Sequence, residues 1–209
     1  MGPPEALILA LQEQLGLADF VETGTYRGDT AAWASGHFAR VTTIEMSPAY
    51  HAATQTRFRA QTGVRTVCGA SGTVLGEVVA ALSQPALFWL DAHWSGLDTA
   101  GQDAECPVLE EIAHINASPL AHAVLVDDAR LFCAPPPRPH HAAQWPDLVT
   151  VVAALHDGGR RHVVLVEDVF VAVPSASREF LTAWLQDQSV ASESSSPGRL
   201  ARWWRKILS

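Results

Sequence analysis

The sequence predicts an α/β fold with a doubly wound, mainly parallel seven-stranded sheet, helices on both faces and a closing antiparallel hairpin. Three observations predict this fold. Short apolar runs alternate with helix-like stretches from residue 7 to residue 126. The runs Ala86–Leu90 and Ala123–Val126 lack polar alternation, as expected of parallel strands that are buried on both faces. Residues 162–173 form two β-like runs joined by a tight polar turn.

The elements are expected in the following order. Leucine and isoleucine at helical spacing, after two prolines, predict an opening helix at Leu7–Leu17. Apolar segments predict strands that end at Val21, Ile44, Val67, Leu90 and Val126. Helices are predicted between these strands at Thr30–Phe38, Pro48–Ala60, Thr73–Leu82 and Pro107–Ile115. Strict alternation favours right-handed crossovers between parallel strands.

The pattern changes after Val126. A Pro-rich loop spans residues 133–141, and a helix is predicted at Leu148–Leu155 before a break at Gly158 and Gly159. The two β runs of residues 162–173 predict a hairpin whose turn lies at Glu167 and Asp168. An antiparallel strand is therefore expected to complete the sheet.

We expect one domain over residues 1–191, followed by a Ser-rich linker and a basic aromatic C-terminal helix over residues 192–209. A chain of 209 residues has the size of a single α/β domain. In the tail, arginines alternate with Trp203 and Trp204, a pattern that permits weak contact with a membrane surface. The favoured alternative is a last helix that packs on the sheet or against a second copy in a homodimer.

Composition limits the function classes. A formal net charge of -8 disfavours nucleic acid as a partner, because the protein would repel a phosphate backbone. Three cysteines without a CxxC pair indicate neither a disulfide framework nor a zinc site, which favours a reducing cytoplasm. The sequence shows no secretory signal and no run of about 18 apolar residues, so we expect neither export nor a transmembrane segment.

Polar residues follow the first two predicted strands. Gly24 and Gly28 allow a tight turn and a close approach of the backbone to a ligand, and Thr30 begins a helix whose free amides favour a carboxylate. Glu45 ends the second strand, where an acid can accept both hydroxyls of an adenosine ribose. The Gly-x-x-x-Gly spacing lacks the third glycine of a dinucleotide site, which favours S-adenosylmethionine over a nicotinamide cofactor.

Acidic residues follow two later strands. Asp91 comes directly after Ala86–Leu90, and Asp127 with Asp128 follows the next strand. Three carboxylates at adjacent strand ends suit an ion such as Mg²⁺, which binds a substrate oxygen and lowers its pKa. Two alternatives stay open: Asp91 is a helix cap, or Arg130 compensates the charge of the aspartate pair.

His93 is the favoured general base, because an ordinary imidazole pKa of about 6.5 suits proton transfer at neutral pH. The sole lysine, Lys206, lies in the tail, which excludes a lysine base near the site. In the alternative interpretation His93 only packs on a neighbouring loop. His140, His141 and Trp145 lie in the Pro-rich segment, where a substrate lid is expected.

Five segments between about Phe20 and Leu131 resemble a known family in their order and approximate spacing. They are ETGTYRGDT, TTIEMSP, VCGASG, FWLDAHW and LVDDAR. In these segments the chain is similar to the class I S-adenosylmethionine-dependent methyltransferases, and within them to the catechol O-methyltransferase-like, divalent-metal-dependent O-methyltransferases. The aspartate pair also resembles that of macrocin-type sugar O-methyltransferases. The resemblance implies a Rossmann-like sheet, S-adenosylmethionine as cofactor and a divalent cation.

The resemblance implies a cofactor role for each matching residue. Gly24 and Thr25 would lie against the methionine part, Thr30 would hold its carboxylate, and Glu22 would support the turn or the amino group. Glu45 would bind the ribose. The whole implied set is Glu22, Gly24, Thr25, Gly28, Thr30, Glu45, Met46, Ser71 and Asp91, in which Met46 covers an adenine face and Ser71 bonds the adenine edge.

The resemblance also implies the metal ligands Asp91, Asp127 and Asp128. We expect His93, the base favoured above, and Asp91 to be the catalytic residues. Two departures from the catechol enzymes concern the base. Ser95 stands where that family places a lysine, and Ala92 is an extra residue between the acid and the histidine. Asp128 stands where those enzymes commonly have an asparagine.

The sequence thus predicts a methyltransferase that uses S-adenosylmethionine and a divalent cation to methylate a hydroxyl on a small molecule of natural-product, sugar or phenolic type. Two alternatives remain. One is a metal-independent O- or N-methyltransferase, in which the aspartates only orient the substrate. The other is a non-catalytic cofactor-binding protein that acts through its basic tail.

Overall fold

The computed structural model of the chain describes residues 2–94, 101 and 104–194. The chain divides into two compact units, residues 1–174 and residues 175–209. The first unit holds the sheet and the predicted site. In the second unit, the described residues form a short 3-10 turn, Ser175–Ser177, and helix α8, Arg178–Ser194.

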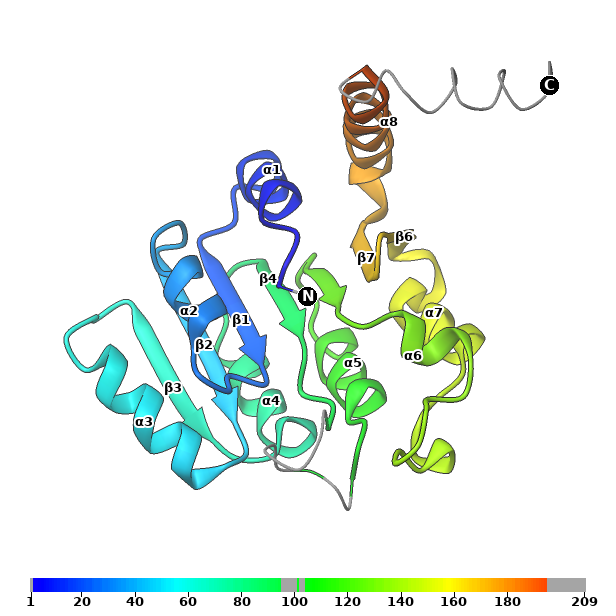
Figure 1. Cartoon of the computed structure of the whole chain (residues 1–209). Coiled ribbons are helices and arrows are strands. Elements are labelled where there is room, and N and C mark those ends of the chain that lie inside the picture. The colour runs from blue at the N-terminus through cyan, green and yellow to red at the C-terminus, as the bar shows by residue number, and fades with distance from the viewer. Residues whose placement is uncertain (1, 95–100, 102–103, 195–209) are drawn as a thin grey trace, which may run out of the picture. The chain divides into compact units, whose positions relative to one another are not determined.

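The sheet has seven strands in the order β3-β2-β1-β4-β5-β7-β6 (Figure 1). Strand β7 runs antiparallel to both of its neighbours, and all other pairs are parallel, which confirms the predicted sheet and closing hairpin. The strands are β1 (Asp19–Thr23), β2 (Arg40–Glu45), β3 (Val64–Cys68), β4 (Ala86–Leu90), β5 (Ala123–Val126), β6 (Arg161–Val166) and β7 (Val169–Pro174). The chain reverses its direction of progress across the sheet between β1 and β4, where open α/β sheets bind ligands.

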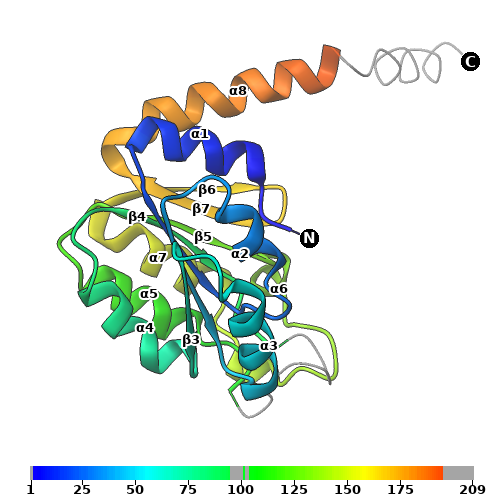
Figure 2. The same ribbon diagram turned by 90° about the vertical axis from the view of Figure 1, so that its left-hand side faces the viewer.

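Helices cover both faces of this sheet, as Figure 2 shows. Helices α2 and α3 lie on one face, whereas α4, α5 and α7 pack side by side on the other. The helices of this unit are α1 (Glu5–Leu15), α2 (Asp29–Ala34), α3 (Pro48–Phe58), α4 (Ser71–Ala80), α5 (Val108–Asn116), α6 (Arg130–Cys133) and α7 (Leu148–His156), with 3-10 turns at Ala142–Gln144 and Asp157–Gly159.

Local signals set several helix ends. The Ser47 hydroxyl accepts a bond from the Tyr50 amide at the start of α3, and Asp147 accepts one from the Thr150 amide at the start of α7. Helix α1 ends at Gly16 in the left-handed conformation, with φ of 62°. These caps satisfy backbone groups that would otherwise lack partners.

Several elements differ from the sequence prediction: helix α6 was not predicted, and helices α1, α3 and α4 begin or end two residues from their expected bounds. Helix α2 ends at Ala34 rather than at Phe38, because the chain turns at Gly36 and Phe38 packs on Phe20, with ring centroids 5.1 Å apart. Helix α8 was not predicted, and it continues through Ser194, so the first three residues of the expected linker are helical. The basic aromatic segment lies outside the described residues, and the division at residue 191 stays a prediction.

One large apolar core cluster lies between the sheet and helices α4, α5 and α7. Every residue of β4 and β5 is buried, as their apolar sequences predict. Phe88, Val124 and Ile112 belong to this core, and burial of each such side chain contributes about 1.5–3 kcal/mol. Among the described residues, no helix is both long and apolar enough to cross a membrane.

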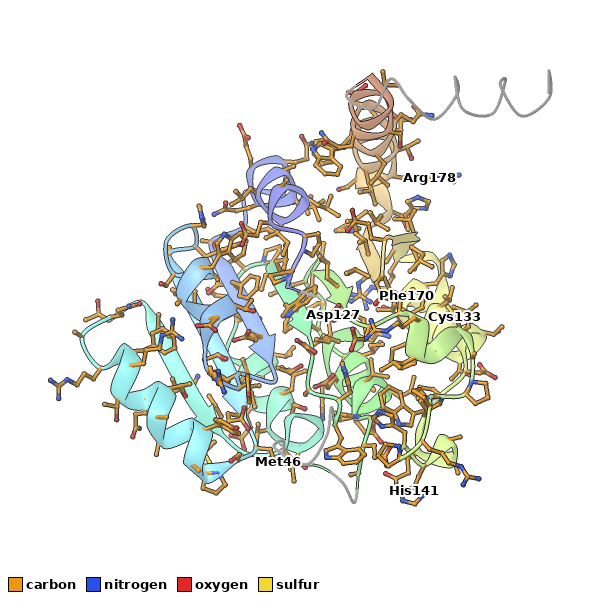
Figure 3. The ribbon with its side chains drawn as sticks, viewed as in Figure 1. Met46, Asp127, Cys133, His141, Phe170 and Arg178 are labelled. Carbon is orange, nitrogen blue, oxygen red and sulfur yellow. The ribbon has the colours of Figure 1, made fainter. Side chains whose placement is uncertain are left out.

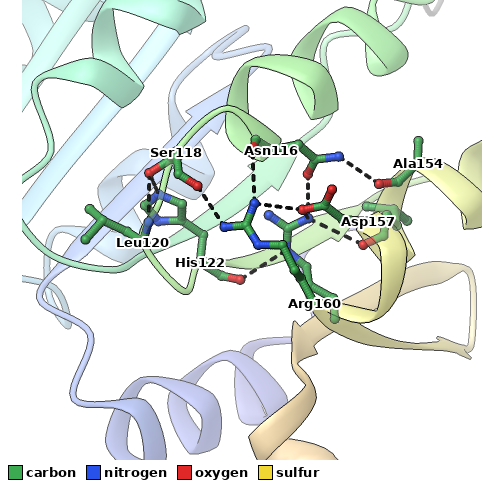
Figure 4. A network of polar contacts seen from close by, with 9 residues as sticks. Asn116, Ser118, Leu120, His122, Ala154, Asp157 and Arg160 are labelled. Carbon is green, nitrogen blue, oxygen red and sulfur yellow. Dashed lines mark hydrogen bonds and ion pairs between the residues drawn. The ribbon is translucent and has the colours of Figure 1, made fainter.

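A polar network joins α5, β5 and β6 on the side of the sheet away from the strands' carboxyl ends (Figure 4). The buried Arg161 donates from Nη1 to Asn116 Oδ1 at 2.6 Å and from Nε to the His122 carbonyl at 3.3 Å. His122 Nδ1 accepts from the Ala86 amide at 3.0 Å, and its Nε2 lies 2.9 Å from Ser118 Oγ. Burial, and then the charges of Arg161 and Arg160, lower the pKa of His122 to about 4.

Candidate active site

The glycine turn after β1 meets the end of β4 directly. Gly24 has φ of +80°, and a Cβ at this residue would lie 2.1 Å from the Asp91 carbonyl oxygen. The amides of Gly24 and Thr25 both donate to the Ile44 carbonyl, at 3.0 and 3.2 Å. The sequence explained Gly24 by close approach to a ligand, whereas in the structure the neighbouring backbone already requires a residue without a side chain.

Glu45 fastens this turn to the end of β2. Its Oε2 accepts from the Tyr26 amide at 2.7 Å and its Oε1 from the Ser47 amide at 2.7 Å. Each carboxylate oxygen keeps a further lone pair for a ribose hydroxyl. Met46 follows with 47% of its surface exposed, unusual for a large apolar side chain and suited to covering an adenine face. The residues present fit a nucleoside cofactor.

Glu22 lies buried beneath the same turn. It accepts a bond from the Thr43 hydroxyl at 2.5 Å and a further one from the Thr30 side chain. Burial, followed by the charges of Asp91 and Glu45, raises the pKa of Glu22 to about 8. Its carboxyl is therefore largely protonated at neutral pH when no cationic group faces it.

Ser71 begins α4 and faces a buried acid that the sequence did not single out. Glu111 is 1% exposed, hydrogen-bonds with Ser71 and Thr23, and its Oε1 has no partner among the described residues. Burial raises the pKa of Glu111 to about 6. The available signal was an acid on the apolar face of α5, in helical register with Val108 and Ile115.

The structure brings His93 between two of the predicted aspartates. His93 Nε2 lies 2.9 Å from Asp128 Oδ2, and its Nδ1 lies 3.6 Å from Asp91 Oδ1. Arg130 Nη1 donates to Asp128 Oδ1 at 2.6 Å and also pairs with Asp168. Asp127 Oδ1 accepts from the Asp128 amide at 2.8 Å, while Asp128 itself has a left-handed backbone with φ of 53°.

The charges in this cluster move the pKa values apart. The hydrogen bond with His93 holds the pKa of Asp128 at about 2, whereas burial raises the pKa of Asp127 to about 6 and also raises that of Asp91. Burial disfavours the His93 imidazolium, but the bond to Asp128 and the charge of Asp91 outweigh it, so the pKa of His93 is raised. The site therefore holds an ionised Asp128 against His93, whose protonated form it favours.

The same contacts bear on the predicted metal site. Both oxygens of Asp128 bind cationic groups, His93 on one side and Arg130 on the other. Across the described part of the chain, no group of three or more His, Cys, Asp and Glu side chains is arranged to hold a metal ion. This arrangement does not fit a divalent cation, and the ligand role of Asp91, Asp127 and Asp128 stays a prediction.

The segment that follows the Pro-rich loop borders the cluster, and the expected substrate lid stays a prediction. Figure 3 labels Met46 after β2, Asp127 after β5 and His141 in this loop, which come from three separate segments of the first unit. The Trp145 ring lies 5.6 Å from the His93 ring, and the His140 ring lies 5.2 Å from that of Trp94. A small pocket beside His93 is lined in part by Leu90, Cys106 and Glu111. All three cysteines of the chain are free.

Comparison with solved structures places the fold. The chain resembles the methyltransferase PaMTH1 of Podospora anserina bound to S-adenosylhomocysteine, with 20% identity, coverage of 83% of this chain and 80% of that one, and a TM-score of 0.58. A Klebsiella pneumoniae protein described as a candidate O-methyltransferase has 12% identity, with 83% of this chain and 81% of that one covered and a TM-score of 0.56. The precorrin-6y C5,15-methyltransferase of Geobacter metallireducens has 15% identity, with 83% of this chain and 89% of that one covered and a TM-score of 0.52.

No protein-family model matches the sequence, and no curated protein is similar enough to count as a relative. The solved structures therefore carry the comparison, and at 12–20% identity they establish the architecture. The shared architecture is the seven-stranded, mainly parallel sheet with its antiparallel hairpin. The chain has the fold of the class I S-adenosylmethionine-dependent methyltransferases.

Proposed function

We propose that the protein transfers a methyl group from S-adenosylmethionine to a hydroxyl on a small molecule, with His93 as general base. The observation that carries this proposal is the position of His93, held between Asp91 and Asp128 at the strand ends next to the nucleoside site. The presence of O-methyltransferases among the proteins of similar fold supports the choice of oxygen.

The cofactor, when bound, supplies an electrophilic methyl group on its sulfonium. The chain's part is to bind, orient and deprotonate. Glu45 and Met46 would hold the nucleoside, with Gly24 and Thr25 against the methionine part and Thr30 at its carboxylate. Fixing both reactants in line can contribute several kcal/mol, because the reaction then becomes effectively unimolecular.

The two nitrogens of His93 have different tasks in this proposal. The ionised Asp128 accepts the proton of Nε2 at 2.9 Å and so fixes the tautomer. The 3.6 Å separation between Nδ1 and Asp91 exceeds a hydrogen bond, which leaves Nδ1 to accept the hydroxyl proton of the substrate. Asp128 and Asp91 then stabilise the imidazolium that forms. Arg130, with Asp168 behind it, keeps Asp128 in place.

The requirement for a divalent cation remains a prediction from the resemblance. The two occupied oxygens of Asp128 favour the metal-independent alternative, in which the aspartates orient His93 and the substrate. A cytoplasmic location, a homodimer and contact of the tail with a membrane surface likewise stay predictions.

Calorimetry with S-adenosylhomocysteine and transfer of a labelled methyl group to a panel of small phenols, sugars and hydroxylated natural products test the proposal. Binding with transfer to at least one hydroxyl is expected. Binding without transfer to any acceptor would support the non-catalytic alternative, and absence of binding would refute the proposed function.

The same assay, repeated after dialysis against EDTA, decides the role of the metal. Retained turnover is expected from the contacts of Asp128. Loss of turnover that Mg²⁺ restores would instead support the catechol-type mechanism.

A further inference from the structure

Glu105 is a fully buried carboxylate at which the Pro-rich loop converges. Its Oε2 accepts from Trp145 Nε1 at 2.7 Å and from His140 Nδ1 at 3.2 Å. The His141 amide donates to both carboxylate oxygens, at 3.0 and 3.1 Å. Gln144 Oε1 accepts from the Glu105 amide at 2.8 Å, so Glu105 binds four residues at the end of the Pro-rich loop and in the turn after it. We call this set the Glu105 clamp.

The clamp extends to the proposed base through one ring. Trp145 donates to Glu105 and packs against His93, with ring centroids 5.6 Å apart. The same indole touches Phe132 and His140, at 5.6 and 5.2 Å. On its other side, the Glu105 carbonyl accepts from the Trp94 amide at 2.7 Å, next to His93 in the chain. His93 is therefore bordered by groups whose positions depend on Glu105.

The charge of Glu105 couples the contacts of the clamp, because each donor helps to stabilise the same buried carboxylate. Burial alone would raise its pKa, but the bonds from Trp145, His141 and His140 hold the pKa of Glu105 below its usual value. An ionised carboxylate with no exposed surface is tolerated only while its donors remain in place. Loss of the charge should release several loop contacts together rather than one.

We infer that Glu105 is a positioning residue for His93, which it holds in place through Trp145 and the Pro-rich loop. The inference rests on the proposed function and deepens it. Four hydrogen bonds join the Glu105 carboxylate to residues 140–145 of the segment that borders His93. Asp91 and Asp128 set the direction of the His93 ring nitrogens, and the clamp sets the place of the ring itself.

Two variants and a control test the inference. Glu105→Gln keeps the shape of the side chain and removes its charge. Trp145→Phe keeps a ring against His93 but removes the N–H donor, and it serves if Glu105→Gln does not fold. Glu110→Gln makes the same chemical change as the first variant at an exposed residue in the first turn of α5.

Three measurements on the full chain separate positioning from general damage. In Glu105→Gln, hydrogen exchange at the His141 amide should accelerate at least tenfold. The ¹⁵N-labelled imidazole resonances of His93, assigned by their absence in His93→Asn, should shift in Glu105→Gln and in Trp145→Phe. Turnover should fall at least tenfold in Glu105→Gln while the Kd for S-adenosylhomocysteine changes less than twofold, because the cofactor residues lie on other elements. Glu110→Gln should match the wild type throughout.

Unmoved His93 resonances in both variants would overturn the inference, and so would an equal fall in turnover and in cofactor affinity. The resonances and the amide exchange require no acceptor. They therefore test the positioning role of Glu105 even if no methyl transfer is found. Absence of methyl transfer would refute the proposed function but not the role of Glu105.

Discussion

His93 shows how a single side chain depends on its neighbours for a chemical role. The bond to Asp128 and the charge of Asp91 raise its pKa, so the imidazole is protonated more often at neutral pH than a free histidine. A protonated ring cannot accept the hydroxyl proton. The neutral form that the mechanism requires becomes available only as the pH rises above the ordinary value.

Turnover should therefore rise with pH above about 6.5, and this rise should vanish in His93→Ala. The variant should lose at least about 100-fold in kcat, in the range attributed to general base catalysis, while its Kd for S-adenosylhomocysteine stays within about twofold. Rate profiles from pH 6 to 9 and calorimetry check both points. Turnover equal to the wild type would return His93 to a packing role.

Glu22 makes a prediction about stability. Its pKa rises from 4.5 in the unfolded chain to about 8 in the fold, because of burial. Between these values the folded state binds a proton that the unfolded state lacks, so the contribution of Glu22 to stability falls as the pH rises from 4.5 to 8. Glu22→Gln should remove this loss of unfolding free energy, which is on the order of a few kcal/mol, so that stability depends less on pH.

Urea unfolding of the cofactor-free protein at pH 5, 6.5 and 8 measures this effect. Glu77→Gln, at an exposed residue of α4, is the matched control. Identical pH slopes for the wild type and Glu22→Gln would show that Glu22 is not protonated preferentially in the fold.

At the scale of elements, the junction of β1 and β4 sets the geometry of the site. Gly24→Ala would place a methyl group 2.1 Å from the Asp91 carbonyl oxygen at a positive φ. The strand ends must then separate, and we expect a loss of about 2–4 kcal/mol in unfolding free energy together with weaker cofactor binding.

Gly36→Ala is the comparison, because its φ is not in the left-handed region and its nearest Cβ neighbour is 3.4 Å away. Thermal unfolding of both variants distinguishes the effects. A Gly24→Ala protein as stable as Gly36→Ala would contradict the close approach of β1 and β4.

The elements themselves were largely predictable from the sequence. Apolar runs such as Ala86–Leu90 define strands whose bounds the structure reproduces, because a strand buried on both faces has no polar residues within it. The end of α2 was not predictable, because the packing of Phe38 on Phe20 is a long-range contact. Glu105 was missed for the same reason: its partners lie 35–40 residues further along the chain.

At the scale of the whole molecule, the buried network around His122 connects α5, β5 and β6 at the edge of the sheet opposite the candidate site (Figure 4). The pKa of His122 falls from 6.5 to about 4 because of burial and the neighbouring Arg161. The unfolded state therefore binds a proton that the fold excludes, and stability should fall as the pH drops from 6.5 to 4.

His122→Asn keeps an acceptor for the Ala86 amide but removes the titrating ring. The variant should be less stable than the wild type at pH 7, by about 1–3 kcal/mol, and should lose less stability between pH 6.5 and 4.5. Denaturant titrations at these values, with the exposed His156→Asn as control, provide the measurement. An unchanged acid slope in His122→Asn would show that this network does not exclude the proton.

The sequence by itself determined the α/β class, the order of the strands, the helices between the parallel strands, the closing hairpin, and the placing of the glycine turn, Glu45 and the three aspartates at strand ends. These follow from local composition, because hydrophobic periodicity and turn residues act over a few neighbouring positions. Only the tertiary structure decided which charges meet. His93 and Arg130 share the oxygens of Asp128, and Glu105 fastens the Pro-rich loop, because folding brings together side chains that no local pattern pairs.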